Sequence, residues 1–116
     1  LAAAETGLDK AQYNLAKAYR DGDGVAQDHA LSVKWFRRAA EQGYTKAQNH
    51  LATRYARGQG ITADMVEAYK WMSLAAQRGH SQAKENLKAL VRQMTPEQRT
   101  EGKQRAAAFN PVRELH

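Results

Sequence analysis

Cysteine is absent from the sequence, which excludes disulfide bonds, thiolate nucleophiles and zinc sites with thiolate ligands. The sequence also lacks an apolar run long enough to cross a bilayer as a helix. Its four histidines include no pair at the three- or four-residue spacing of a helical metal site, and it contains neither a phosphate-binding loop nor a nucleophile elbow. We therefore predict no catalytic residue, no cofactor, no metal site and no small-molecule substrate.

Acidic residues are in the minority, because 12 Asp and Glu face 18 Lys and Arg, for a net charge of +6. Such a surface favours acidic partners, which include nucleic acid, anionic lipid headgroups and acidic protein segments. A set of solvated basic side chains on exposed helices would give the same balance. The length of 116 residues, with 42% hydrophobic and 26% charged residues, is typical of one folded domain.

Glycine, alanine and leucine recur with a period of 36 residues. The recurring positions are Gly7, Gly43 and Gly79, then Ala11, Ala47 and Ala83, and then Leu15, Leu51 and Leu87. The first two units also match at Tyr19 and Tyr55, Gly22 and Gly58, Gly24 and Gly60, Asp28 and Asp64, and Trp35 and Trp71. A unit this short cannot bury its own apolar face, so neighbouring units must stack. The sequence therefore predicts an all-α solenoid.

Each unit is expected to contain two helices joined by a glycine turn. Apolar residues recur at steps of three and four, and no strand-like alternation competes with this pattern. The expected N-caps of the first helices are Asp9, Thr45 and Ser81. The second helices are expected to begin at Asp28 and Asp64, and Glu67 follows Asp64 at the spacing of a capping box. Left-handed glycines are expected to end the helices.

The large aromatic residues are predicted to lie in the core. Trp35 and Trp71 occupy matched positions with apolar neighbours, which favours burial over a role as exposed anchors for a partner. The same argument applies to Tyr19 and Tyr55.

The third unit departs from the repeat. It lacks the Gly-x-Gly turn, and its second helix is expected to start at Thr95-Pro96 with Gln98 completing a capping box. Gly102 falls at the position of Trp35 and Trp71, and the helix is polar almost all round, which is typical of a cap on a repeat array. The expected divisions are 1–7 as the end of a preceding repeat helix, 8–43 and 44–79 as two repeats, 80–110 as a degenerate third repeat with a capping helix, and 111–116 as a frayed tail.

A long, regularly spaced set of residues resembles the Sel-1-like repeat, a relative of the tetratricopeptide repeat. The matching residues are Ala39, Ala40, Gly43, Ala47, Leu51, Tyr55, Gly58, Gly60, Ile61, Asp64, Lys70, Trp71, Ala75, Ala76 and Gly79, with their partners in the first unit. The resemblance covers about residues 1 to 92. It implies a right-handed α-α superhelix that holds other proteins, from a bacterial source, with an adaptor or regulatory role in signalling or the cell envelope. It also implies a periplasmic or secreted location ahead of a cytoplasmic one, and it supplies no catalytic residues.

The first helix of each unit lines the concave side in tetratricopeptide-type superhelices, so the resemblance places the candidate partner-binding residues there. Removing the apolar stripe leaves Lys10, Tyr13, Asn14, Lys17, Arg20, Lys46, Asn49, His50, Thr53, Arg57, Gln82, Glu85 and Asn86. Tyr13 is predicted to be the exposed aromatic residue of this groove, with Arg54 nearby. Because asparagine can bond a peptide backbone as donor and acceptor and the cations can pair with carboxylates, the face suits an acidic or C-terminal peptide.

Two functions compete. The first is a non-enzymatic scaffold that docks a peptide or a partner domain in a basic concave groove. The second is a basic solenoid that binds nucleic acid or another anionic polymer, which the shortage of exposed aromatic residues in the groove disfavours. Self-association through an apolar end near Ala2, Ala3 and Leu8 is a third possibility.

Overall fold

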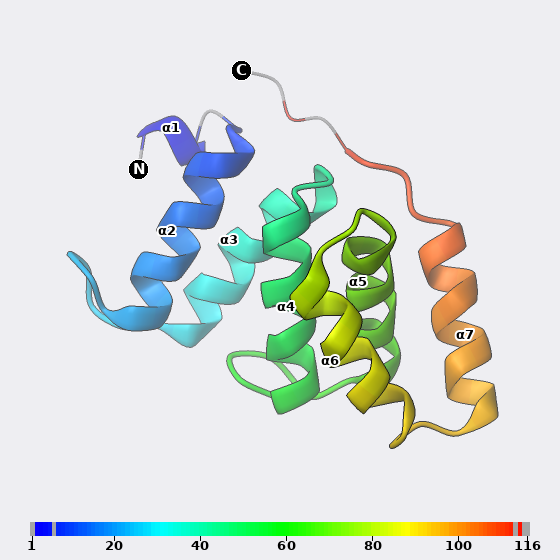
Figure 1. Cartoon of the computed structure of the whole chain (residues 1–116). Coiled ribbons are helices and arrows are strands. Elements are labelled where there is room, and N and C mark those ends of the chain that lie inside the picture. The colour runs from blue at the N-terminus through cyan, green and yellow to red at the C-terminus, as the bar shows by residue number, and fades with distance from the viewer. Residues whose placement is uncertain (1, 6, 113, 115–116) are drawn as a thin grey trace.

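The structure, a computed structural model, describes residues 2–5, 7–112 and 114. Within these residues it contains seven helices and no strand, so the predicted all-α solenoid is confirmed. The helices are α1 (Ala2–Glu5), α2 (Asp9–Asp21), α3 (His29–Glu41), α4 (Thr45–Arg57), α5 (Met65–Gln77), α6 (Ser81–Val91) and α7 (Pro96–Ala107). Successive helices from α1 to α6 pack against one another, and α7 packs on α5, so that α1 and α2 lie at one end of the array and α7 at the other (Figure 1).

Glycines end the first helix of each full repeat, as predicted. Gly22 and Gly58 follow α2 and α4 in the left-handed conformation, with φ of 71° and 65°. In this conformation the peptide N–H of each glycine reaches back to a free carbonyl of the last helical turn. Gly60 has a second role, because a Cβ there would collide with the backbone of His29 at the start of α3. The turn of the second repeat can therefore lie directly against the first repeat.

The expected N-caps of the second helices are confirmed. The side chain of Asp28 accepts a hydrogen bond from the peptide N–H of Leu31, and Asp64 accepts bonds from Val66 and Glu67. The Glu67 carboxylate does not close a capping box, because it pairs with Arg105 of α7 at 2.7 Å. Thr95 and Gln98 form the complete capping box that was predicted at the start of α7.

The expected N-caps of the first helices are wrong by one residue. The capping positions are Leu8, Tyr44 and His80, and the predicted Asp9, Thr45 and Ser81 are the first helical residues. Leu8 and Tyr44 make no side-chain cap, whereas the His80 ring accepts from the peptide N–H of Ala83. Backbone geometry decides these boundaries, because each glycine turn is followed by one extended residue before helical dihedrals begin.

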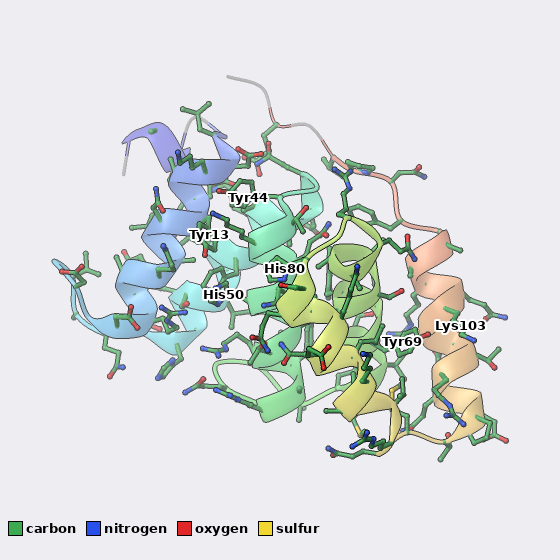
Figure 2. All side chains as sticks on the ribbon, in the orientation of Figure 1. Tyr13, Tyr44, His50, Tyr69, His80 and Lys103 are labelled. Atoms are coloured by element: carbon green, nitrogen blue, oxygen red, sulfur yellow. The ribbon has the colours of Figure 1, made fainter. Side chains whose placement is uncertain are left out.

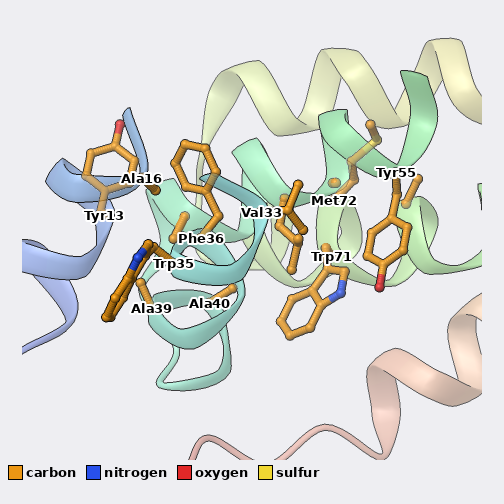
Figure 3. Packing of buried hydrophobic residues seen from close by; sticks show 14 of the residues in the cluster. Tyr13, Ala16, Val33, Trp35, Phe36, Ala39, Ala40, Tyr55, Trp71 and Met72 are labelled. Atoms are coloured by element: carbon orange, nitrogen blue, oxygen red, sulfur yellow. The ribbon is translucent and has the colours of Figure 1, made fainter. Parts of the chain in front are cut away.

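The core forms one continuous layer between successive helices (Figure 3). Trp35 and Trp71 are 7% and 1% exposed, which confirms that they are core residues. Tyr55 is also buried, and Tyr19 is partly buried against the same cluster. Fully buried alanines such as Ala39 and Ala47 let the helices approach closely.

Helix α7 packs on α5 through Gly102. This glycine is buried, and a Cβ at its position would lie 2.5 Å from Cδ1 of Tyr69. The first two repeats place tryptophan at the matched position, so the close contact here is specific to the last helix. Its outer face carries exposed polar residues, among them Glu97 and Lys103.

The predicted fraying of 111–116 is wrong for the part of this segment that the structure describes. The chain returns from α7 along the array towards α1 and α2 (Figure 1). The peptide N–H of Val112 donates to the carbonyl of Glu41 at 2.7 Å, and Glu114 forms a 2.7 Å ion pair with Arg38 of α3. Residues 113, 115 and 116, like residues 1 and 6 at the other end, lie outside the described residues.

Candidate partner-binding pocket

A cavity of about 390 Å³ opens on the face formed by α2, α4 and α6, and we call it the arginine pocket. Its lining residues are Arg20, Asn49, His50, Thr53, Arg54, Ala56, Arg57, Met72, Gln82, Asn86, Ala89, Leu90 and Gln93. Three are arginines, and none of the described lining residues is acidic. Since these residues come from the first helices of all three units, with Met72 contributed by α5 and Gln93 by the turn after α6, stacking the repeats is what assembles the pocket.

The candidate residues predicted from the sequence divide between the pocket and its surroundings. Those that line it are Arg20, Asn49, His50, Thr53, Arg57, Gln82 and Asn86. Those that lie outside its lining are Lys10, Tyr13, Asn14, Lys17, Lys46 and Glu85. Asn14, His50 and Asn86 occupy matched positions in the three units, but only His50 and Asn86 share the pocket, and Asn14 stands exposed outside it.

Tyr13 is not the exposed aromatic residue that was predicted. It is only 8% exposed, and its ring lies 5.2 Å from that of Tyr44 and 5.9 Å from that of Phe36. Figure 2 shows Tyr13, Tyr44 and His50 together where α2 meets α4. Burial of the phenol raises the pKa of Tyr13, with a further contribution from Tyr44. Phe36 of the first repeat and Tyr44 and His50 of the second repeat therefore surround the Tyr13 ring.

His50 connects the pocket to this aromatic cluster. Its ring stacks on Phe36 at 5.0 Å, its Nε2 lies 3.3 Å from the Tyr13 hydroxyl, and its Nδ1 lies 3.2 Å from the Arg20 guanidinium. Because arginine can only donate, Nδ1 must accept and Nε2 must carry the proton. Burial, reinforced by the charges of Arg20 and Arg54, lowers the pKa of His50 to about 4. The ring is therefore neutral at physiological pH.

A chain of side-chain amides crosses the pocket from α6 to α4. Gln82 donates to Oδ1 of Asn86 at 3.0 Å, and Asn86 donates to Oδ1 of Asn49 at 3.3 Å. Asn49 is 8% exposed, and its own NH₂ group makes no hydrogen bond within the described residues. The direction of this chain leaves the NH₂ group of Asn49 available as a donor in the pocket.

Arg54 is the pocket residue that the sequence interpretation placed only nearby. It is 6% exposed, and its Nε is buried without a hydrogen-bond partner in the described part of the chain. A signal was available in the sequence, because the 36-residue period aligns Arg54 with Ala18 and Leu90, which belong to the apolar stripe. A lone arginine in an apolar column is a departure that packing alone does not explain.

An apolar wall completes the pocket. Met72 and Leu90 are buried core residues that reach the lining, and Ala56 and Ala89 lie beside them on α4 and α6. The pocket therefore combines cationic and amide donors with an apolar surface.

No cluster of metal-ligating side chains occurs among the described residues, and none of their helices is long and apolar enough to span a membrane.

Comparison with known proteins identifies the repeat. The Sel1 repeat family model matches residues 9–44 and 45–80, which is more than half of the chain. No curated protein matches the sequence.

Two solved structures show the same fold. One is a protective antigen of uropathogenic Escherichia coli with an SLR fold, which is 31% identical with a TM-score of 0.89 over 92% of this chain. The other is a Sel1 repeat protein from Oxalobacter formigenes, which is 41% identical with a TM-score of 0.74 over 75% of this chain. The matches span 23% of the first protein and 65% of the second. The chain belongs to the Sel1 repeat family, whose helical repeat proteins generally mediate protein–protein interaction.

Proposed function

We propose that this protein is a non-enzymatic scaffold that holds a segment of a partner protein on the face formed by α2, α4 and α6. The observation that carries the proposal is the arginine pocket, which has three arginines and no acidic residue among its described lining. A cavity of this composition attracts negative charge and orients it through donors in fixed positions. An acidic partner segment is therefore the best fit.

The positions predicted outside the pocket fit an extension of the same site. Lys10, Asn14 and Lys46 are exposed, and Lys17 is partly exposed. A segment that enters the arginine pocket could continue along α2 and α4 past these side chains. We propose them as the periphery of the site, where charge steers association more than it adds affinity.

We further propose that residues 80–110 end the array as a degenerate third repeat with α7 as its cap. The polar outer face of α7 and its close packing through Gly102 support this role.

Self-association at the opposite end of the array is a separate proposal, supported by Leu8, which is 44% exposed, and by exposed Ala3. The side chain of Ala2 lies outside the described residues.

Nucleic acid is the second candidate partner, and the basic charge is its support. The burial of Tyr13 counts against it, because the arginine pocket has no tyrosine, tryptophan or phenylalanine in its described lining on which bases could stack. Binding to nucleic acid predicts an affinity that falls linearly with the logarithm of salt concentration, whatever the polymer sequence.

Affinity capture from a lysate of the source organism, at low and high salt, tests the scaffold function. The groove variant combines Arg57→Glu with Gln82→Glu, since both side chains are exposed and line the pocket. The matched control combines Lys103→Glu with Gln104→Glu, which changes the charge equally on exposed positions of α7, far from His50 (Figure 2). We expect a discrete protein that survives high salt and is lost only with the groove variant. Recovery of nucleic acid alone, or equal loss with both variants, would reject the proposal.

A further inference from the structure

The arginine pocket contains a buried cation, Arg54, that forms no ion pair with a carboxylate of the described residues. Arg54 is 6% exposed, its Nε has no hydrogen-bond partner, and none of the ion pairs in the described part of the chain includes it. Removing a guanidinium from water without pairing it is costly, and the fold retains this cost at a position where the neighbouring repeats have Ala18 and Leu90. Such an arrangement is expected where the missing partner is supplied from outside.

The surrounding charges increase the need for an anion. Burial lowers the pKa of Arg54, the nearby cations Arg57 and Arg20 lower it further, and the carboxylate of Asp21 offsets these effects only in part. Arg20 has an anionic partner in Asp21, with its Nε 2.9 Å from the carboxylate, and it also donates to His50. Arg57 is exposed and makes no ion pair in the described chain. Arg54 and Arg57 are therefore the two cations of the pocket that remain available.

The polar and apolar groups around Arg54 define the shape of the missing anion. The NH₂ group of Asn49 is held as a donor, because Asn86 occupies the Oδ1 atom of Asn49. Met72 and Leu90 supply an apolar wall in the same cavity. A carboxylate accepts parallel hydrogen bonds from a guanidinium and can accept a further bond from an amide.

We propose that the arginine pocket binds the C-terminal carboxylate of a partner chain whose last residue is apolar. This inference rests on the proposed scaffold function and specifies its ligand. A chain terminus presents a carboxylate and a side chain on the same carbon atom, which matches donors and an apolar wall that share one cavity of about 390 Å³. The carboxylate pairs with Arg54 and accepts from Asn49, and the last side chain packs on Met72 and Leu90.

An NMR titration with defined peptides tests this inference on the intact chain. The probes are N-acetyl-Ala-Ala-Leu with a free C-terminal carboxylate and the same peptide as its C-terminal amide, at matched chloride concentration. The observed signals are the Nε–Hε group of Arg54 and the side-chain NH₂ group of Asn49. We expect the free acid to shift both signals saturably and the amide to bind at least tenfold more weakly.

Variants separate recognition by Arg54 from general charge. Arg54→Met removes the guanidinium and is expected to weaken binding of the free acid at least tenfold, and Arg54→Lys keeps the charge but loses the paired donors and is expected to give an intermediate affinity. Arg99→Met on α7 removes the same charge outside the pocket, and binding is expected to stay within twofold of the unmodified chain. Amide and methyl spectra verify that each variant is folded.

Several results would overturn the inference. Equal binding of the acid and the amide would remove the role of the carboxylate, and unshifted Arg54 signals would remove the site. Tighter binding of N-acetyl-glutamate amide would assign the pocket to an acidic side chain, and tighter binding of inorganic phosphate would assign it to phosphate. The two proposals can fail separately. If a partner is captured and lost with the groove variant but the peptide does not bind, only recognition of the terminal carboxylate is rejected. If the peptide binds but no partner is captured, only the scaffold function is rejected.

Discussion

The first two repeats have nearly the same core but different faces. Trp35 and Trp71 occupy the same buried position, and so do the glycines that end α2 and α4. By contrast, Ala18 of the first repeat becomes Arg54 in the second, and Asn14 becomes His50. The tryptophans and glycines that stack the units are shared, whereas the two positions that change to Arg54 and His50 line the arginine pocket in the second repeat.

This difference separates residues that stack the repeats from residues that we propose bind a partner. A repeat protein requires the same stacking contacts at every interface, so core positions recur. A binding site needs chemistry at one place only, so its residues break the recurrence. A charged residue at a recurring apolar position is therefore a stronger indicator of function than a charged residue on an exposed helix face, where many sequences satisfy the fold.

The largest effect is expected from the shared core position. Trp71→Ala should lower the free energy of unfolding by about 3–5 kcal/mol, because Trp71 is 1% exposed and packs edge-on against Phe109 at 5.4 Å. Trp35→Ala should cost less, since Trp35 is 7% exposed and therefore removes less apolar surface from water. Urea unfolding of both variants measures the difference. An equal or larger loss of unfolding free energy for Trp35→Ala would contradict the expectation that the more deeply buried tryptophan contributes more.

The third unit replaces tryptophan with glycine at this position, and Gly102→Ala tests that exchange. Alanine favours a helix over glycine by about 1 kcal/mol, but its methyl group would collide with the buried ring of Tyr69. We expect a net loss of roughly 1–3 kcal/mol, measured by urea unfolding. Lys103→Ala, at an exposed position of the same helix, serves as the control and should change stability little. A gain in stability for Gly102→Ala would mean that α7 does not need its close contact with α5.

Arg54→Met should increase stability, in the opposite direction to the core variants. The substitution removes an unpaired buried cation and replaces it with an apolar side chain, as in the matched positions Ala18 and Leu90. We expect a gain of about 1–2 kcal/mol in the free energy of unfolding. Arg57→Met is the matched control, and because Arg57 is exposed it should change stability by less than about 0.5 kcal/mol. A destabilised Arg54→Met variant would show that the guanidinium is already paired in the free protein.

Recurrence made the fold predictable from the sequence. The helices, the glycine turns, the caps at Asp28 and Asp64 and the buried tryptophans all follow from residues that repeat at a fixed spacing. The N-caps of the first helices could not be placed to the residue, because Leu8 and Tyr44 cap without a side-chain hydrogen bond and leave no signal in residue type.

The candidate site was less predictable, since it depends on which side chains a neighbouring repeat covers. Tyr13 lies on the predicted groove face but is buried where α4 meets α2, and Arg54 belongs to the apolar stripe but opens into the pocket. Helical periodicity places a residue on a face of its own helix and does not report the packing of the next unit. The exposed candidates Lys10, Asn14, Lys46 and Glu85 stay predictions, because neither contacts nor burial singles them out.

His50 provides the expected effect that depends on pH. The matched residues Asn14 and Asn86 do not titrate, whereas burial lowers the pKa of His50 from 6.5 to about 4 in the folded chain. The unfolded state therefore binds the proton more strongly between pH 6.5 and 4, so the contribution of His50 to stability is complete above pH 6.5 and is lost as the pH falls towards 4. We expect this loss to be about 1–2 kcal/mol, because partial exposure of the ring reduces the full value of the shift. Urea unfolding of the unmodified chain and of His50→Gln, at pH 7 and at pH 4.5, isolates the effect from the other histidines and the carboxylates. Parallel pH profiles for the two proteins would mean that His50 is protonated as easily in the folded chain as in the unfolded one, and the neutral ring between Tyr13 and Arg20 would then have to be abandoned.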